Sequence, residues 1–283
     1  MGAGVGLSFL FFVVCAGVME AYGDTPAAQI ASFHPSRPVV IAHRGASEIA
    51  PENTLAALRV AAKLGVAAVE FDVHASRDGH IVLMHDHTLQ RTTTGKGRVA
   101  RHRLSQLRNL DAGSWFEPRF SGEPIPTLHE ALGAIGTTMV ACIEIKSGTV
   151  ALPKVAEALK STGTHERAII FSFLPKQIQR SKAVMPAVPA LLLVELSALV
   201  SYSSVGLVEQ VTQSNADMLG LDHRGVTPEL VEALHQSGLP VFVYTVDAPA
   251  DVRRVVESGV DGIISNQPRA TLSRVFQHRP RSK

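Results

Sequence analysis

Three observations predict an α/β fold built on a closed parallel barrel. From residue 39 onward, short apolar runs of strand length alternate with segments of helical periodicity. The strand-like runs are apolar without strict alternation, which is typical of parallel strands that are covered on both faces. Eight repeats of this β-then-α unit favour a closed barrel with a site at the carboxyl ends of its strands. A doubly wound open sheet is the main alternative, but no G-x-G-x-x-G loop follows the first strand-like run.

The expected elements follow one another in a regular order. Strands are predicted at residues 39–42, 68–73, 81–84, 139–146, 168–173, 190–195, 217–221, 240–246 and 262–265. Helices are predicted at residues 53–64, 127–135, 150–159, 175–183, 205–211, 228–236, 249–257 and 269–276. In the first helix, Leu55, Leu58 and Ala62 have helical spacing, and Gly65 is placed to end it.

The segment from about 87 to 126 differs in composition from the rest of the chain. It is polar, rich in Gly and Pro, and has little periodicity. We therefore expect an insertion after the second strand region rather than part of the barrel core. The predicted organisation is a barrel at 38–277, preceded by a linker at 24–37 and followed by a basic tail at 278–283.

Composition sets limits on the function. The chain has 283 residues, of which 46% are hydrophobic and 18% charged, enough for a large core without stabilising cross-links. The net charge of +2 and the aromatic content of 5% give no support to nucleic-acid binding. Of the two cysteines, Cys15 lies in the N-terminal apolar run, and Cys142 is expected to be a small buried hydrophobe.

The N-terminal residues predict export. An apolar run at 7–19 is short for a bilayer crossing and is followed by Ala21 and Gly23, small residues placed as in a signal-peptide cleavage site. Residues 1–23 are therefore expected to be a signal peptide, which would make the protein periplasmic or secreted. No Lys or Arg precedes the run, so an uncleaved membrane anchor and a misassigned start codon remain alternatives.

Charged residues and histidines recur where the predicted strands end. Glu70 and Asp72 are two residues apart in a strand and share one face, as do Glu144 and Lys146. His43 and His85 directly follow two other strand-like runs. Because the strand ends of a parallel barrel converge on one mouth, these side chains are expected to meet there. Any one of these residues, taken alone, is more often part of a structural ion pair or a polar strand end. Their recurrence at the same end of several strands favours a functional site.

The residue types predict a metal and an anionic substrate. Glu70, Asp72 and Glu144 would supply hard oxygen ligands, which suit Mg²⁺ or Ca²⁺. Zinc is disfavoured because no Cys/His ligand spacing is present. With a divalent cation, Arg44 and Lys146 would make a positive pocket suited to phosphate. Two histidines on either side of phosphorus would then serve as base and acid.

The motifs resemble those of the glycerophosphodiester phosphodiesterases. The resemblance begins at His43-Arg44-Gly45 and spans about residues 38–271, nearly the whole predicted mature chain. The matching segments are Pro51-Glu52-Asn53-Thr54, Val69-Glu70-Phe71-Asp72-Val73, Asp78-Gly79, His85-Asp86, Leu89 with Arg91-Thr92-Thr93, Gly95, Gly97, Leu110-Asp111-Ala112-Gly113, Pro126-Thr127-Leu128, Glu144-Ile145-Lys146, Tyr244-Thr245-Val246 and Asp261-Gly262-Ile263-Ile264.

The resemblance implies a TIM barrel that hydrolyses glycerophosphodiesters to glycerol 3-phosphate and an alcohol with a divalent cation, Mg²⁺ or Ca²⁺. It implies that His43 and His85 are the acid-base pair and that Glu70, Asp72 and Glu144 hold the metal. Arg44 and Lys146 would bind phosphate. By analogy with related phospholipase C barrels, the neighbouring glycerol hydroxyl would attack first and give a cyclic phosphate that water then opens.

Two positions depart from the family pattern. Tyr244 stands where the family usually has Trp, and Ser265-Asn266 where it usually has Thr-Asp. Tyr244 is expected to stack on glycerol and to add a hydroxyl group. Asn266 is expected to change only a loop contact. Both departures are expected to alter head-group preference rather than chemistry.

The sequence leaves two other functions open. One is lysophospholipase D activity, which needs an apolar approach that Trp115, Phe116 and Phe120 of the insertion could form, although a small satellite core is their expected use. The other is a catalytically silent barrel that binds lipid head groups, which would have no need of both histidines. Membrane contact, alcohol preference, the choice of metal and the oligomeric state stay undetermined by the sequence.

Overall fold

A closed barrel of parallel strands forms the centre of the protein. The computed structural model describes residues 23–32, 37–146, 148, 150, 152–199 and 201–277. Within these residues, eight parallel strands close through the pairing of the first with the second, Ile41 with Ala68 and Ala42 with Val69. The strands are β1 (Val39–Ala42), β2 (Ala68–Ala75), β4 (Val140–Ile145), β5 (Ala168–Ser172), β6 (Ala190–Val194), β7 (Met218–Asp222), β8 (Val241–Tyr244) and β9 (Gly262–Ser265). The barrel prediction is confirmed, and the open-sheet alternative is wrong.

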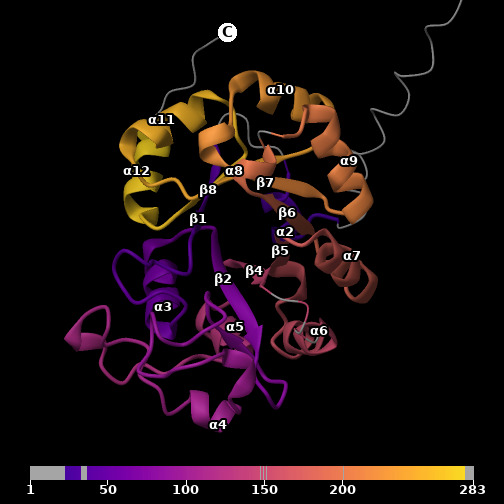
Figure 1. Ribbon diagram of the computed structural model, residues 1–283. Coiled ribbons are helices and arrows are strands. Elements are labelled where there is room, and N and C mark those ends of the chain that lie inside the picture. Colours follow the sequence, from indigo (N-terminus) through magenta and orange to yellow (C-terminus); the bar gives the residue numbers. More distant parts are fainter. Residues whose placement is uncertain are drawn as a thin grey trace, which may run out of the picture.

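Helices surround the barrel and connect its strands (Figure 1). They are α3 (Leu55–Leu64), α5 (Leu128–Ala134), α6 (Leu152–Ser161), α7 (Pro175–Val184), α8 (Leu196–Leu199), α9 (Ser204–Ser214), α10 (Pro228–Gln236), α11 (Pro249–Glu257) and α12 (Pro268–Gln277). Helix α3 begins where the Thr54 side chain accepts a hydrogen bond from the Ala57 amide, and it ends at Gly65, whose φ of 71° is left-handed. The remaining single turns are η1 (Val99–Arg101), η2 (Pro118–Phe120), η3 (His165–Arg167) and η4 (His223–Gly225).

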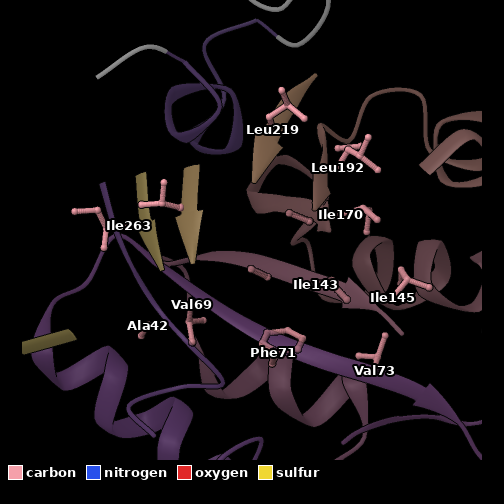
Figure 2. Packing of buried hydrophobic residues seen from close by; sticks show 14 of the residues in the cluster. Ala42, Val69, Phe71, Val73, Ile143, Ile145, Ile170, Leu192, Leu219 and Ile263 are labelled. Atoms are coloured by element: carbon pink, nitrogen blue, oxygen red, sulfur yellow. The ribbon is translucent and has the colours of Figure 1, made fainter. Parts of the chain in front are cut away.

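Side chains alternate between the two faces of each barrel strand. Val69, Phe71 and Val73 lie on one side of β2, within the large apolar cluster between strands and helices (Figure 2). Residues of the opposite parity point to the barrel axis, where Cys142 and other apolar side chains form a second cluster. Cys142 is therefore a buried free thiol, as its apolar surroundings in the sequence predict. On β2 the inward positions are occupied by Glu70 and Asp72, which carries them into the barrel mouth.

A short helix lies in the segment that the sequence predicts as a linker. Helix α2 (Pro26–Ile30) begins at Thr25, whose side chain accepts a hydrogen bond from the Ala28 amide. Its Ala27 and Ile30 are buried in the interior cluster together with Ile41, Val140 and other strand residues. The linker interpretation is corrected here, because five helical residues are too few to show a periodic pattern in sequence. The helix packs against the interior cluster beside β4 and η3.

One predicted strand has an unexpected direction. Strand β3 (Ile81–Leu83) pairs antiparallel to the extended end of β2, with Val73 opposite Leu83 and Ala75 opposite Ile81. It is therefore not a barrel strand, and the sequence-based view that His85 ends a parallel strand is wrong. His85 nevertheless lies at the mouth of the barrel. Strand β3 is antiparallel to β2, and the Met84 amide that follows it donates to the Asp72 carbonyl, which places the next residue, His85, beside the site.

The insertion has a small core of its own. It contains α4 (Leu104–Leu107), and it extends from one side of the barrel in Figure 1. Its buried cluster consists of Val82, Met84, Leu89, Val99, Leu107, Ala112 and Ile125. Trp115, Phe116 and Phe120 are not in that cluster. Phe116 contacts each of the other two rings edge to face, and Trp115 is 41% exposed. A satellite core thus exists, but other side chains build it.

Replacing Gly262 with alanine is expected to lower the free energy of unfolding by about 1–3 kcal/mol, since the new methyl group overpacks the barrel interior. Gly262 lies opposite Phe242 in the neighbouring strand, and an added Cβ would overlap the buried Phe242 ring. Urea denaturation of both proteins measures the change. Gly133→Ala in helix α5, where an added Cβ has no atom within 4 Å, is the matched control and is expected to be neutral or stabilising. Equal midpoints for the two variants would contradict this packing argument.

The two chain ends are outside this description. The predicted signal peptide (1–23, apart from Gly23) and basic tail (278–283) lie outside the described residues, so export stays a prediction. Among the residues that are described, no helix is both long enough and apolar enough to span a bilayer.

Candidate active site

A cavity of about 210 Å³, lined by charged residues on one side and apolar residues on the other, opens at the carboxyl ends of the barrel strands. Its walls include all the charged residues that the sequence predicts except Asp72, which lies buried beneath them. The lining residues are His43, Arg44, Glu70, His85, Glu144, Lys146, Phe171, Phe173, Leu193, Tyr244, Thr245 and Ile264. These residues come from β1, β2, the β3 hairpin, β4, β5, β6, β8 and β9, so the closure of the barrel brings them together.

Three carboxylates converge in this cavity. One oxygen from each of Glu70, Asp72 and Glu144 lies within 4.8 Å of the others, and all three residues are buried. Burial, together with the Asp72 and Glu144 charges, raises the pKa of Glu70 well above its ordinary value. Burial, followed by the Asp72 charge, raises the pKa of Glu144 to about 7. Like charges held this close are unfavourable without a cation between them.

The carboxylate oxygens leave bonding capacity for such a cation. Glu70 Oε1 and Asp72 Oδ1 are buried and accept no hydrogen bond from any described residue. Buried acceptors of this kind are costly in protein interiors unless an ion or water occupies the space beside them. The donor set is all oxygen, which fits Mg²⁺ or Ca²⁺. The residues present therefore fit the divalent cation that the sequence predicts.

Two cations lie against the carboxylates. Lys146 Nζ is 2.8 Å from Glu144 Oε1 and 3.5 Å from Asp72 Oδ1. Arg44 Nε is 3.4 Å from Asp72 Oδ2, and the Arg44 amide donates to Glu70 Oε2 at 2.9 Å. Burial opposes ionisation of Asp72, but Arg44 and Lys146 outweigh it and hold the pKa of its carboxyl below the usual value.

The local backbone after β1 fixes the position of Arg44. Arg44 has a φ of 55° and Asn53 a φ of 57°, and the Asn53 amide donates to the Arg44 carbonyl. The Asn53 side chain also donates to Asp72 Oδ2 at 2.8 Å and accepts from the Asp72 amide at 3.0 Å. Left-handed backbone at non-glycine residues is uncommon and is tolerated where surrounding contacts compensate for it. The Pro51–Thr54 motif therefore orients a carboxylate of the site.

His43 is held from behind by an amide. Its Nδ1 lies 2.7 Å from Asn266 Oδ1, and its Nε2 lies 3.8 Å from Glu70 Oε2. Burial, followed by the Arg44 charge, lowers the pKa of His43 from 6.5 to about 4. Burial thus favours the neutral imidazole form of His43. Asn266 contacts the ring itself, so the expectation that this departure changes only a loop contact is wrong.

His85 is held by a carboxylate instead. Its Nδ1 lies 2.7 Å from Asp86 Oδ1, and Arg91 Nε donates to Asp86 Oδ2 at 2.8 Å. Arg91 also binds both oxygens of Glu52 at 2.8 Å, and Glu52 accepts from Arg44 at 2.9 Å. This chain of charge-assisted bonds joins the insertion to the loop after β1. Burial, the largest influence, lowers the pKa of His85.

Two aromatic rings form the apolar side of the cavity. Phe173 and Tyr244 contact edge to face, with ring centroids 5.6 Å apart. The Tyr244 hydroxyl donates to the Val194 carbonyl at 2.8 Å, and burial, followed by the Asp222 charge, raises the pKa of this hydroxyl. The Tyr244 ring is therefore available to contact a ligand. Its hydroxyl, which the sequence analysis expected to add a group for the substrate, instead donates to the backbone.

The eight residues that the sequence singles out all lie at this one cavity or directly beneath it. They are His43, Arg44, Glu70, Asp72, His85, Glu144, Lys146 and Tyr244. Sequence reasoning assigned no role to four of their supporting side chains, which are Asn53, Asp86, Arg91 and Asp247. The first three stand inside the quoted motifs, which was a signal that they matter. Asp247 follows the Tyr244-Thr245-Val246 motif and had no such signal.

Comparison with known proteins places the chain in a family. Residues 43–270 match the glycerophosphoryl diester phosphodiesterase family. The chain belongs to this family. The matched range includes every residue of the cavity described above.

Relatives of this phosphodiesterase family resemble nearly the whole barrel. A glycerophosphodiester phosphodiesterase from Caldanaerobacter subterraneus is 39% identical over 245 residues, covering 84% of this chain and 97% of that protein. One from Bacillus subtilis is 33% identical, covering 83% of this chain and 85% of that protein. The solved structure of an Oleispira antarctica phosphodiesterase in complex with its product sn-glycerol-3-phosphate is 30% identical, with a TM-score of 0.79 and coverage of 85% of this chain and 98% of that one.

Proposed function

We propose that the protein hydrolyses glycerophosphodiesters to glycerol 3-phosphate and an alcohol, using a divalent cation. The observation that carries the proposal is the placement of two histidines, three carboxylates and two cations around one cavity. Family membership and the product complex of the Oleispira antarctica relative support it.

Glu70, Asp72 and Glu144 would hold the cation, Mg²⁺ or Ca²⁺. When bound, the cation supplies Lewis-acid stabilisation of negative charge on the phosphoryl oxygens. Arg44 and Lys146 lie beside the same carboxylates and would bind the phosphate. With three carboxylates and two basic side chains, a divalent cation leaves the site positive and therefore attractive to a phosphodiester anion.

The hydrogen-bond partners of the histidines divide their roles. The amide oxygen behind His43 accepts a hydrogen bond from Nδ1–H, which leaves the Nε2 lone pair free to act as a base. The carboxylate behind His85 acts in the opposite direction to burial, because it stabilises the imidazolium that an acid requires. His43 would take the proton of the neighbouring glycerol hydroxyl as its oxygen bonds to phosphorus, and His85 would protonate the departing alcohol oxygen. Water then opens the cyclic phosphate, with the two histidines exchanging roles.

The surroundings of the cavity disfavour the lysophospholipase D alternative. A second cavity of about 670 Å³ shares Phe173 and Tyr244 with the first, which gives the leaving alcohol a route outward. Its other lining residues are Glu195, Leu196, Ser197, Asp222 and Arg224. An acyl chain placed there would contact the apolar surface of Phe173, Leu196 and Tyr244, but it would also desolvate the charged groups of Glu195, Asp222 and Arg224 without replacing their interactions. These charged groups are the observation that favours a small polar alcohol over a lipid chain.

Purified protein is expected to release glycerol 3-phosphate from glycerophosphocholine when Mg²⁺ or Ca²⁺ is present, and to lose this activity after chelation because the carboxylates then lack their cation. Product is measured with a coupled glycerol 3-phosphate assay. Glycerophosphoethanolamine and lysophosphatidylcholine are tested in parallel. Turnover of the lysolipid alone would favour the lysophospholipase D alternative. Saturable binding without turnover of any substrate would identify a silent head-group-binding barrel.

A further inference from the structure

The orientation of the Asn266 amide is fixed by a residue that does not contact His43. Asp247 accepts three hydrogen bonds, from Ser265 Oγ at 2.9 Å, the Asn266 amide at 2.8 Å and Asn266 Nδ2 at 2.7 Å. A carboxylate can only accept, so the NH₂ group of Asn266 must face Asp247. The carbonyl oxygen of the same amide must then face His43 and Ser47.

This orientation dictates which nitrogen of His43 carries the proton. Asn266 Oδ1 lies 2.7 Å from His43 Nδ1 and can only accept, so Nδ1 is the protonated nitrogen. Nε2 then presents its lone pair in the cavity. If the amide were reversed, its NH₂ group would require an unprotonated Nδ1, and the proton would move to Nε2. That tautomer has no lone pair with which to accept a proton from substrate.

We propose that Asn266 and Asp247 are positioning residues that hold His43 in the Nδ1-protonated tautomer, with Asp247 acting through Asn266. Because the tautomer matters only if His43 is a base, this proposal rests on the proposed function. The link joins the ends of three neighbouring strands, since Asp247 follows β8, Asn266 follows β9 and His43 follows β1. It differs from the arrangement at His85, whose Nδ1 meets a carboxylate directly.

The pairing predicts a reciprocal rescue. At present the Asn266 Nδ2 amide lies 2.7 Å from the Asp247 carboxylate. In Asn266→Asp a second carboxylate replaces this amide, and repulsion from Asp247 is expected to move the new side chain away from His43. Adding Asp247→Asn restores a donor opposite the introduced carboxylate, whose free oxygen can again accept from Nδ1. We expect Asn266→Ala and Asn266→Asp each to lower kcat by about 10- to 100-fold, well below the loss of about 10⁴-fold that follows when a triad histidine takes the wrong tautomer. The double variant N266D/D247N should recover most of that loss.

The measurements are kcat, KM and the ring ¹⁵N shifts of His43 in histidine-labelled enzyme with Mg²⁺ or Ca²⁺ present. His43→Ala identifies the His43 signals. The wild type should show the proton on Nδ1, and Asn266→Ala a mixture of tautomers, with KM nearly unchanged. Gln267→Ala, on the same loop, is the matched control and should keep wild-type kcat, because the two hydrogen bonds of Gln267 to Ser265 and Thr271 are made by its backbone.

Two results would overturn the proposal. One is a double variant no more active than Asn266→Asp; the other is an Asn266→Ala enzyme whose His43 stays wholly protonated on Nδ1. Because the ¹⁵N measurement needs no substrate, it separates this proposal from the proposed function. Absence of turnover in the wild type with an intact Nδ1 tautomer would reject the function but not the positioning of His43.

Discussion

Alanine at His43 or at His85 is expected to reduce kcat/KM for glycerophosphocholine by about 10²–10⁴-fold or more, the usual contribution of a positioned acid or base. Both imidazole rings line the same cavity. Nδ1 of His43 is hydrogen-bonded to Asn266 and Nδ1 of His85 to Asp86, which leaves Nε2 of each ring for proton transfer. Steady-state kinetics with saturating Mg²⁺ or Ca²⁺ measure the effect.

The fold should survive both substitutions. The two side chains lie at the mouth, with exposed fractions of 15% for His43 and 30% for His85, rather than in either apolar cluster. Thermal unfolding followed by circular dichroism serves as the control for structure. His165→Ala, which removes a histidine that is 59% exposed and outside the cavity lining, controls for the loss of an imidazole. A histidine variant that retains near wild-type kcat/KM would remove that residue from the acid-base pair.

Glutamine at position 70 is expected to raise the cation concentration needed for half-maximal activity by about 10- to 100-fold or more and to lower kcat, because a metal ligand is lost while the side-chain shape is kept. Glu70 shares the cation-sized space with Asp72 and Glu144, and its Oε1 accepts no hydrogen bond within the described structure. Activity is measured as a function of Mg²⁺ and of Ca²⁺ concentration.

A readout that does not depend on turnover comes from unfolding. A cation that binds only the folded protein raises its stability by mass action, so Mg²⁺ or Ca²⁺ should raise the wild-type melting temperature more than that of Glu70→Gln. Glu195→Gln removes an exposed carboxylate at the neighbouring cavity and is the matched control for charge. Identical cation dependence in Glu70→Gln and the wild type would exclude Glu70 as a ligand.

The sequence predicted the barrel and the members of the site because both depend on short-range patterns. The two-residue spacing of Glu70 and Asp72 gives a shared strand face in any register, and convergence at the mouth follows from parallel topology. The direction of β3 could not be predicted in this way. A short apolar run is equally compatible with parallel and antiparallel pairing, and only the hairpin with β2 decides between them.

The supporting contacts were beyond prediction for a related reason. His43 and Asn266 are separated by 223 positions, and Arg91 and Glu52 by 39. Such pairs form only once the barrel has closed or the insertion has docked. Neither periodicity nor composition encodes them, so Asn266 was assigned to a loop contact and Asp247 received no role. Helix α2 was missed because its five residues are too few to show a periodic pattern.

The separate core of the insertion bears on how activity could be lost. Arg91, which braces Asp86 and Glu52, is carried by a segment whose buried cluster is distinct from the two clusters of the barrel. Cooperative units of a protein can open independently when their cores are separate. Sub-global opening of this segment would release the brace behind His85 while the barrel stayed folded. We therefore expect activity to be lost at a lower temperature than the barrel fold, because the smaller core opens first.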